Sequence, residues 1–287
     1  MIFDYLCTPS KIKIVILQQL CLFCSLPNKN KMTVYTTEIA SDELTSDNPI
    51  HQRLLKAYYV AQDLVSGNLL EIGCGEGRGV ELLAPKLTTY TAVDKIKEVV
   101  SKLSIKHPES KFIQTNIPPL PFEDNCFDSV VSFQVIEHIK EDATYLKEIH
   151  RVLKPGGKAY ISTPNIKMTL SRNPWHIREY TATELTQLCA TVFSSVEMKG
   201  IGGNEKVMEY YLQNKASVHK IMKYDVFNLQ HHLPAAILKI PYEILNRRNR
   251  NKLQSSDDSL VATIHHSDYL LSNEPAKSLD LFAVLKK

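Results

Sequence analysis

The segment that most limits how this chain can fold is residues 69–79, where an apolar run ends in the carboxylate of Glu71. Glycines then stand at every second position, at Gly73, Gly75 and Gly77, before a segment with helical spacing begins. Because glycine has no Cβ, such a chain can turn sharply and let a ligand touch its backbone. The helix that follows would present its N-terminus to the same ligand. Several nucleotide-binding folds share this pattern, so the surrounding sequence must decide what it binds.

The surrounding sequence alternates between strand-like and helix-like patterns. Short apolar runs lie at 68–72, 90–94, 111–115, 127–133 and 158–162, with helical patterns near 78–87, 95–106 and 140–153. Strands and helices that alternate in this way indicate a parallel sheet covered by helices on both faces. Ligands of such sheets bind at the carboxyl ends of the strands, which is where the glycine-rich segment lies. We therefore predict a doubly wound α/β fold with its site at that edge.

Four blocks of this sequence, in this order, resemble the class I S-adenosylmethionine (SAM)-dependent methyltransferases over roughly residues 50–200. The blocks are the glycine loop at 71–77, the run 91–94, the segment 119–139 and the segment 148–157. The Glu137-His138 pair is similar to that of quinone-pathway and related small-molecule methyltransferases. The resemblance implies a Rossmann-like, mostly parallel, seven-stranded sheet with an antiparallel last strand, and residues 279–285 fit that strand.

The resemblance places SAM at the glycine loop. Gly73, Gly75 and Gly77 would let the backbone run against the methionine and ribose parts of SAM. Glu71 is placed near the amino-acid end, where a buried carboxylate needs a cationic or hydrogen-bonded partner. A ligand ammonium and the amides of the loop are the two candidates for that partner. Asp94 is predicted to accept hydrogen bonds from both ribose hydroxyls, a role that NAD enzymes share.

The adenine and the methyl group are assigned to the next two strands. Asn116 and Ile117 end the third predicted strand, where relatives commonly place an aspartate that contacts the adenine amino group. Asparagine can still accept that hydrogen bond. Gln134 closes the fourth strand, where the methyl donor meets its acceptor. The predicted cofactor is SAM, and these three residues are predicted to contribute to its site.

Two histidines are candidates for removing a proton from the acceptor. Methyl transfer depends mainly on positioning and on excluding water, but an oxygen or nitrogen acceptor also benefits from a base that titrates near neutrality. His176, after the fifth strand, is the first catalytic candidate, and His138, after the fourth, is the second. A purely structural role is the alternative for His138. Trp175 would either line the acceptor site or hold its own segment against the core.

The remaining histidines and the charge balance guide the expected partners. His231-His232 and His265-His266 are adjacent pairs, whose side chains diverge in a strand and are about 100° apart in a helix. We therefore predict no metal site. A net charge of +3 is too small to indicate nucleic acid, and the basic run at 246–252 is interpreted as a solvated loop, with an anionic-partner patch as the alternative. Six scattered cysteines indicate a reducing compartment, which we take to be the cytoplasm. Oligomeric state is not predicted.

The chain is predicted to hold one enlarged domain. The methyltransferase domain would span 34–287, with an insertion at 203–258 that either caps the pocket or forms a satellite core. Residues 1–33 would be an N-terminal extension. Either translation starts at Met32 and the preceding residues are a mis-assigned start, or the extension is a weak apolar anchor. Its apolar stretch at 12–26 is shorter than the about 20 residues that cross a bilayer, so no stable membrane span is predicted.

These observations predict a SAM-dependent methyltransferase that acts on a small-molecule acceptor, with O-methylation slightly favoured over N- or C-methylation. The first alternative is a nicotinamide-dependent oxidoreductase, which the position of Glu71 and the blocks at 119–122 and 154–157 disfavour. The second alternative is a non-catalytic SAM-binding protein. The intact glycine loop and Asp94 argue against it.

Overall fold

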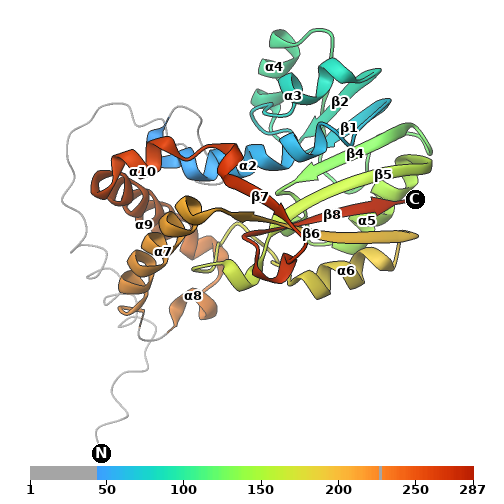
Figure 1. Cartoon of the computed structure of the whole chain (residues 1–287). Coiled ribbons are helices and arrows are strands. Elements are labelled where there is room, and N and C mark those ends of the chain that lie inside the picture. The colour runs from blue at the N-terminus through green and yellow to red at the C-terminus, as the bar shows by residue number, and fades with distance from the viewer. Residues whose placement is uncertain (1–43, 226–227) are drawn as a thin grey trace, which may run out of the picture. The chain divides into compact units, whose positions relative to one another are not determined.

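The computed structural model describes residues 44–225 and 228–287 (Figure 1). All of them belong to one compact unit that spans Thr36–Lys287. The predicted N-terminal extension at 1–33 lies outside the described residues. None of the helices within the two described ranges is both long enough and apolar enough to span a bilayer.

One eight-stranded sheet organises the unit, with the strand order β3-β2-β1-β4-β5-β8-β6-β7 (Figure 1). The strands are β1 (Asn68–Ile72), β2 (Thr89–Asp94), β3 (Lys111–Gln114), β4 (Phe127–Phe133), β5 (Leu153–Pro164), β6 (Ser195–Gly203), β7 (Tyr269–Ser272) and β8 (Asp280–Lys286). Neighbours among β1 to β5 pair in parallel, whereas β8 is antiparallel to both β5 and β6. The predicted α/β fold, mostly parallel with an antiparallel last strand, is confirmed.

The sheet has one strand more than the seven that were predicted. The additional strand, β7, pairs antiparallel with β6 at the edge of the sheet. Its four residues do not alternate between apolar and polar, because Leu270 and Leu271 are consecutive and both exposed. A strand without a period of two gives no sequence signal, so β7 was not predicted.

Helices cover both faces of the sheet. They are α2 (Asn48–Ala61), α3 (Val80–Leu83), α4 (Lys97–Lys106), α5 (Asp142–Val152), α6 (Ala182–Ala190), α7 (Glu205–Met222), α8 (Leu229–His232), α9 (Ala235–Ser256) and α10 (Asp258–Thr263). Short 3₁₀ turns are η1 (Thr45–Asp47), η2 (Ala84–Lys86), η3 (Ile136–His138), η4 (Ile166–Met168), η5 (His266–Asp268) and η6 (Pro275–Lys277). Successive strand residues enter opposite cores: Leu69 packs with Tyr58 of α2, and Leu70 with Leu146 of α5. This alternation follows from the period of two in a strand.

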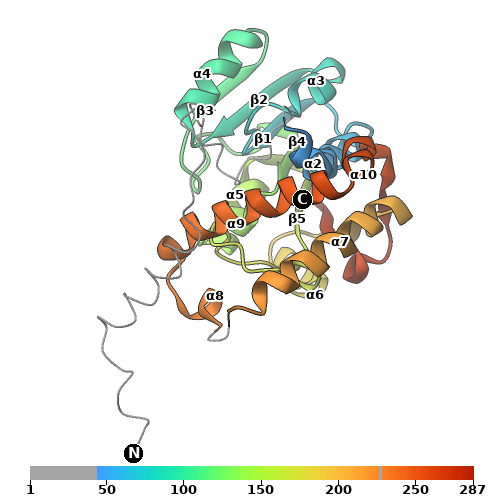
Figure 2. The ribbon, with the colours of Figure 1, turned by 90° about the vertical axis from the view of Figure 1, so that its left-hand side faces the viewer.

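The helices α7 to α10 lie between β6 and β7 in the sequence and cover the predicted insertion. Figures 1 and 2 both show α7 and α9 side by side, and the two helices are in contact. Polar contacts join this group to the segment after β5; among them, Arg172 donates from Nη1 to the carbonyl oxygens of Gln230 at 2.7 Å and Leu233 at 3.2 Å. The insertion is therefore attached to that segment.

The basic run at 246–252 is helical, so its interpretation as a solvated loop is wrong. It lies within α9, and two of its arginines bind Asp47, which is 0% exposed. Arg247 donates from Nη1 at 2.6 Å and Arg250 donates from Nη1 at 3.0 Å, both to Oδ1. A buried carboxylate needs such partners. These ion pairs connect α9 to the start of α2.

Removing the carboxylate of Asp47 should therefore cost stability. Asp47→Ala should lower the free energy of unfolding by about 3–5 kcal/mol, because it leaves Arg250 buried without its counter-charge. The matched control is Glu81→Ala, which breaks the exposed pair between Glu81 and Lys106 and should cost about 1 kcal/mol or less. Urea denaturation measures both. Equal midpoints for the two variants would contradict the structural role of Asp47.

Candidate active site

The glycine loop follows β1 and has a left-handed backbone at three positions. The φ angles of Gly73, Gly75 and Gly77 are +76°, +49° and +81°, a region that favours glycine. A Cβ at Gly73 would lie 2.4 Å from Cγ2 of Val135, and one at Gly77 would lie 2.4 Å from Cδ2 of Leu103. At Gly75 a Cβ would meet no heavy atom within 4 Å. The outer two glycines thus allow close packing, and Gly75 faces space that a ligand can occupy.

Asp94 ends β2 beside this loop, as the sequence predicted. Its Oδ2 accepts a hydrogen bond from the amide of Gly75 at 2.9 Å, and its Oδ1 accepts one from the amide of Ile96 at 2.9 Å. A carboxylate oxygen can accept more than one hydrogen bond. Both oxygens therefore keep capacity for a ligand diol, while the two amides fix the direction of the carboxylate.

Glu71 ends the apolar run of β1 and is 1% exposed. The hydroxyl of Tyr58 donates to Oε1 at 2.7 Å, and the hydroxyl of Tyr90 donates to Oε2. Burial raises the pKa of Glu71 to about 8; the Tyr58 hydrogen bond and the charge of Arg78 act in the opposite direction, whereas Asp94 adds to the rise. The two tyrosines, from α2 and β2, are partners that the sequence did not predict, since a ligand ammonium and the loop amides were the two candidates. A contact with the ligand ammonium remains a prediction.

Asn116 and Ile117 do not end a strand. The strand β3 stops at Gln114, and both residues lie in the loop that follows it. Asn116 is exposed, whereas Ile117 is half-buried and packs against the core beneath α5. The amide of Thr115 donates to the carbonyl oxygen of Asp94 at 2.9 Å. The loop therefore starts next to Asp94, on the side of the sheet edge where the adenine was predicted.

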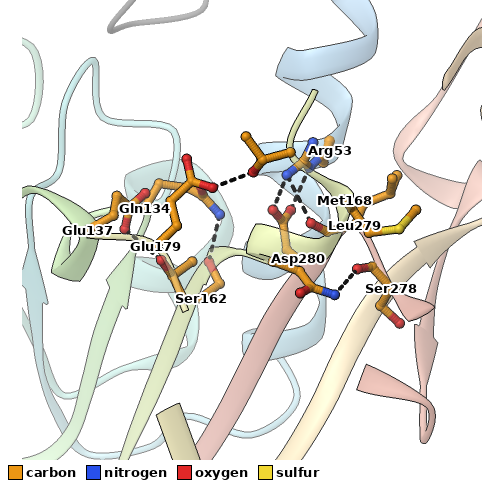
Figure 3. A network of polar contacts seen from close by, with 12 residues as sticks. Arg53, Gln134, Glu137, Ser162, Met168, Glu179, Ser278, Leu279 and Asp280 are labelled. Atoms are coloured by element: carbon orange, nitrogen blue, oxygen red, sulfur yellow. Dashed lines mark hydrogen bonds and ion pairs between the residues drawn. The ribbon is translucent and has the colours of Figure 1, made fainter. Parts of the chain in front are cut away.

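Gln134 follows the last residue of β4 and has a φ of +58°. That backbone costs a non-glycine residue about 1–2 kcal/mol, and such positions cluster at functional sites. The amide of Gln134 donates to the carbonyl oxygen of Ser162 at 2.8 Å, and its Nε2 donates to the Ser162 hydroxyl at 3.5 Å (Figure 3). The next residue in the chain, Val135, lies against Gly73 of the glycine loop, so the ends of β1 and β4 are adjacent.

The structure brings together the two histidines that are the candidates for removing a proton from the acceptor. The rings of His138 and His176 have centroids 5.0 Å apart and planes at 84°. Nδ1 of His138 lies 2.9 Å from the carbonyl oxygen of Trp175. Nδ1 of His176 lies 2.6 Å from Oε1 of Glu179, and its Nε2 lies 2.8 Å from Nδ2 of Asn173. Both ring nitrogens of His176 thus have protein partners, and its role as a base stays a prediction.

Glu137 belongs to the same cluster and was not among the predicted site residues. It is 1% exposed, and burial raises its pKa to about 7 against the opposing charge of His176. Thr163 donates from Oγ1 to Oε2 of Glu137 at 2.9 Å, while Oε1 has no hydrogen-bond partner within residues 44–225 and 228–287. The signal in the sequence was an acidic residue within an otherwise apolar segment, which a buried carboxylate at a site would explain.

Trp175 connects the cluster to the helical insertion. Nζ of Lys239, on α9, lies 3.5 Å from the centroid of the Trp175 ring, which is a cation–π contact. The indole Nε1 is buried and has no hydrogen-bond partner in the part of the chain that the structure describes. The contact with Lys239 fits the prediction that Trp175 holds its segment in place. The unpartnered Nε1 fits the other prediction, that Trp175 lines the acceptor site.

Comparisons with known proteins agree with this geometry. Residues 70–161 match a family model described as a methyltransferase domain. The matched residues include the glycine loop, Asp94 and Gln134. A probable SAM-dependent methyltransferase from Mycolicibacterium smegmatis is 37% identical over 154 residues, which cover 52% of this chain and 57% of that protein. The chain therefore matches just over half of that relative's length.

Two further similarities extend the comparison. A phthiotriol/phenolphthiotriol dimycocerosates methyltransferase from Mycobacterium tuberculosis is 29% identical over 171 residues, which cover 58% of this chain and 61% of that protein. The crystal structure of a Thermotoga maritima SAM-dependent methyltransferase aligns with a TM-score of 0.53 and 14% identity, and covers 83% of this chain and 92% of that one. The second similarity shows that the methyltransferase fold extends well beyond residues 70–161.

The residues present fit SAM, whose ribose diol, ammonium and sulfonium need acceptors and an open backbone. Gly75 supplies the open backbone and Asp94 two directed acceptor oxygens.

Asp94→Ala should weaken SAM binding by about 1.5–3 kcal/mol, the range for hydrogen bonds to a charged group. Asp94→Asn, which keeps one acceptor oxygen, should lose less. Calorimetry measures both affinities, and an unchanged affinity in Asp94→Ala would remove this residue from the site.

The pKa of Glu71 leads to a pH-dependent stability. Between about pH 4.3, where an unfolded glutamate ionises, and its folded pKa of about 8, the native state holds a proton that the unfolded state has lost. The free energy of unfolding should therefore fall as pH rises through this window, by up to about 1.4 kcal/mol per pH unit. Glu71→Gln should make this fall shallower and leave only the share of Glu137, whose pKa is raised to about 7, whereas the exposed Glu81→Gln should leave the fall unchanged. Urea unfolding from pH 5 to 8 in the absence of ligand compares the three proteins; parallel curves would contradict the assignment.

Proposed function

We propose that this protein is an enzyme that transfers the methyl group of SAM to a small-molecule acceptor. The observation that carries the proposal is the contact between the glycine loop and the end of β4. Val135 packs against Gly73, so the polar cluster that begins at Gln134 stands beside the space at Gly75. A methyl donor bound over the glycine loop would direct its sulfonium towards that cluster. Positioning two reactants in this way accounts for much of the rate of such a transfer.

The acceptor group that fits best is a hydroxyl, so we favour O-methylation. A hydroxyl donates one hydrogen bond, and Oε1 of Glu137 is a buried acceptor without a protein partner. The unpartnered Nε1 of Trp175 is a donor in the same region and suits the oxygen of an acceptor. The name of the M. tuberculosis relative includes a triol, phthiotriol. That name supports a hydroxyl-bearing, lipid-like acceptor for this chain as well.

The remaining assignments follow from the same proposal. The methyltransferase domain would span 34–287, with the insertion at 203–258 placed to shape the acceptor site through the contact between Lys239 and Trp175. Among the described residues Cys74, Cys126 and Cys189 are free thiols, which supports the cytoplasm as the location. A net charge of +3 is too small to favour a nucleic-acid partner.

The proposal is tested with the full chain, methyl-labelled SAM and a fractionated cell extract. Label should move into a small-molecule fraction, and S-adenosylhomocysteine should accumulate in equal amount. Mass fragmentation of the product identifies whether oxygen, nitrogen or carbon carries the label. Asp94→Ala should lose both signals at low SAM concentration, and Glu98→Ala, an exposed acidic residue on α4, should keep them.

Two outcomes would overturn the proposal. Tight SAM binding without labelled product in any fraction would identify a non-catalytic SAM-binding protein. A thermal shift with NAD(P) that exceeds the shift with SAM would favour the oxidoreductase, because Asp94 suits the ribose of either cofactor. A product methylated on nitrogen or carbon would overturn only the preference for oxygen.

A further inference from the structure

Three potential metal-ligand atoms gather at the acceptor side of the site. They belong to Glu137, His138 and His176, and all lie within 4.8 Å of one another. Glu137 and His138 are neighbours in the turn η3, and His176 comes from the segment after β5. The amides of Ile177 and Arg178 donate to the carbonyl oxygen of Glu137 at 2.7 and 3.2 Å, which fixes the two segments against each other.

The carboxylate of Glu137 is the observation that indicates a ligand. Thr163, which is itself buried, donates to Oε2 and so holds the group in one orientation. Oε1 is buried and has no hydrogen-bond partner among the described residues. An unpartnered buried acceptor is destabilising, and more so if it is charged. A cation at Oε1 would remove that cost.

Both histidines are oriented in the way that metal-binding histidines usually are. A carbonyl oxygen can only accept, so His138 must donate from Nδ1 to Trp175. A carboxylate likewise accepts from Nδ1 of His176, at Oε1 of Glu179. Each Nε2 is then the nitrogen with the lone pair. A ligating histidine almost always donates its other N–H to a carboxylate or a carbonyl. Here His138 donates to a carbonyl oxygen and His176 to a carboxylate.

We propose that Glu137, His138 and His176 bind one divalent transition-metal ion, with Zn²⁺ the best match to the ligand set. The ligands would be Oε1 of Glu137 and Nε2 of each histidine. Two histidines and a glutamate form a three-ligand zinc site that leaves the fourth position open. With bonds of about 2.0–2.2 Å, the ligand atoms must move closer together than they are here, and Nδ2 of Asn173 must leave Nε2 of His176.

The fourth position gives the metal a use, which rests on the proposed function. It would hold the hydroxyl oxygen of the acceptor beside Gln134 and lower the pKa of that hydroxyl, and this bond to the metal would replace the direct hydrogen bond from the hydroxyl to Oε1 of Glu137. The hydroxyl proton passes to water, the oxygen forms the bond to the methyl carbon, and the carbon–sulfur bond breaks to leave S-adenosylhomocysteine. The prediction of no metal site considered only adjacent histidine pairs. The fold supplies the third ligand from a different part of the chain.

The site is tested by metal binding, without SAM or acceptor. Chelator-treated full-length protein should bind one Zn²⁺ per chain in calorimetry, and Co²⁺ in its place should give the absorption of a four-coordinate ion. His176→Ala and Glu137→Gln should each weaken Zn²⁺ binding at least about 100-fold, more than the 10–100-fold typical for outer-shell partners. Asn173→Ala should strengthen it, because it removes the amide that occupies Nε2 of His176. The last change distinguishes this site from adventitious binding.

The control is the double variant His231→Ala with His232→Ala, which should bind Zn²⁺ as the wild type does. Thermal unfolding of each metal-free variant shows whether it folds, and His176→Ala serves if Glu137→Gln does not. Wild-type protein that binds no Zn²⁺, or a control variant that loses binding as His176→Ala does, would overturn the inference. Methyl transfer that persists at full rate in chelator would overturn it while leaving the proposed function intact.

Discussion

The parallel pairing of β1 with β2 on one side and β4 on the other is the constraint on which the rest of this structure depends. Leu69 of β1 stands level with Tyr90 of β2 and Ser129 of β4. Because parallel strands in register end at one edge, the glycine loop, Asp94 and Gln134 emerge together. The tyrosines on Glu71 reinforce this arrangement, since they tie the end of β1 to α2 and β2. A site whose polar groups are positioned by backbone pairing needs few additional contacts to be formed before a ligand arrives.

The sequence was most informative where an element is set by its own periodicity. The apolar runs at 68–72 and 127–133 coincide with β1 and β4, because each is a mostly buried run that is followed by a glycine or a polar residue. The prediction of a loop at 246–252 was wrong because the partner of two arginines in this run, Asp47, lies about 200 residues earlier in the chain. No local pattern can report such a partner. The same applies to β7, which exists only because β6 offers it an edge.

The candidate site divides along the same line. Residues at strand ends, such as Gly75, Asp94 and Gln134, could be placed from the order of the strands alone. The partners that tertiary packing supplies could not be predicted: Glu137 was missed as a site residue, and the contacts of His176 with Asn173 and Glu179 were not foreseen. Whether a buried carboxylate has a partner, or a ring nitrogen is already occupied, depends on segments that the sequence does not bring together. Fold topology predicts positions, and packing determines their chemistry.

The contact between Lys239 and Trp175 has a consequence for how such proteins diverge. It attaches the insertion to the segment after β5, which lies beyond the part matched by the family model at residues 70–161. Substitutions in α8 and α9 can therefore reshape what approaches Trp175 without altering any hydrogen bond of Asp94 or Glu71. Descendants of one ancestral fold can in this way adopt new acceptors while inheriting the methyl donor unchanged.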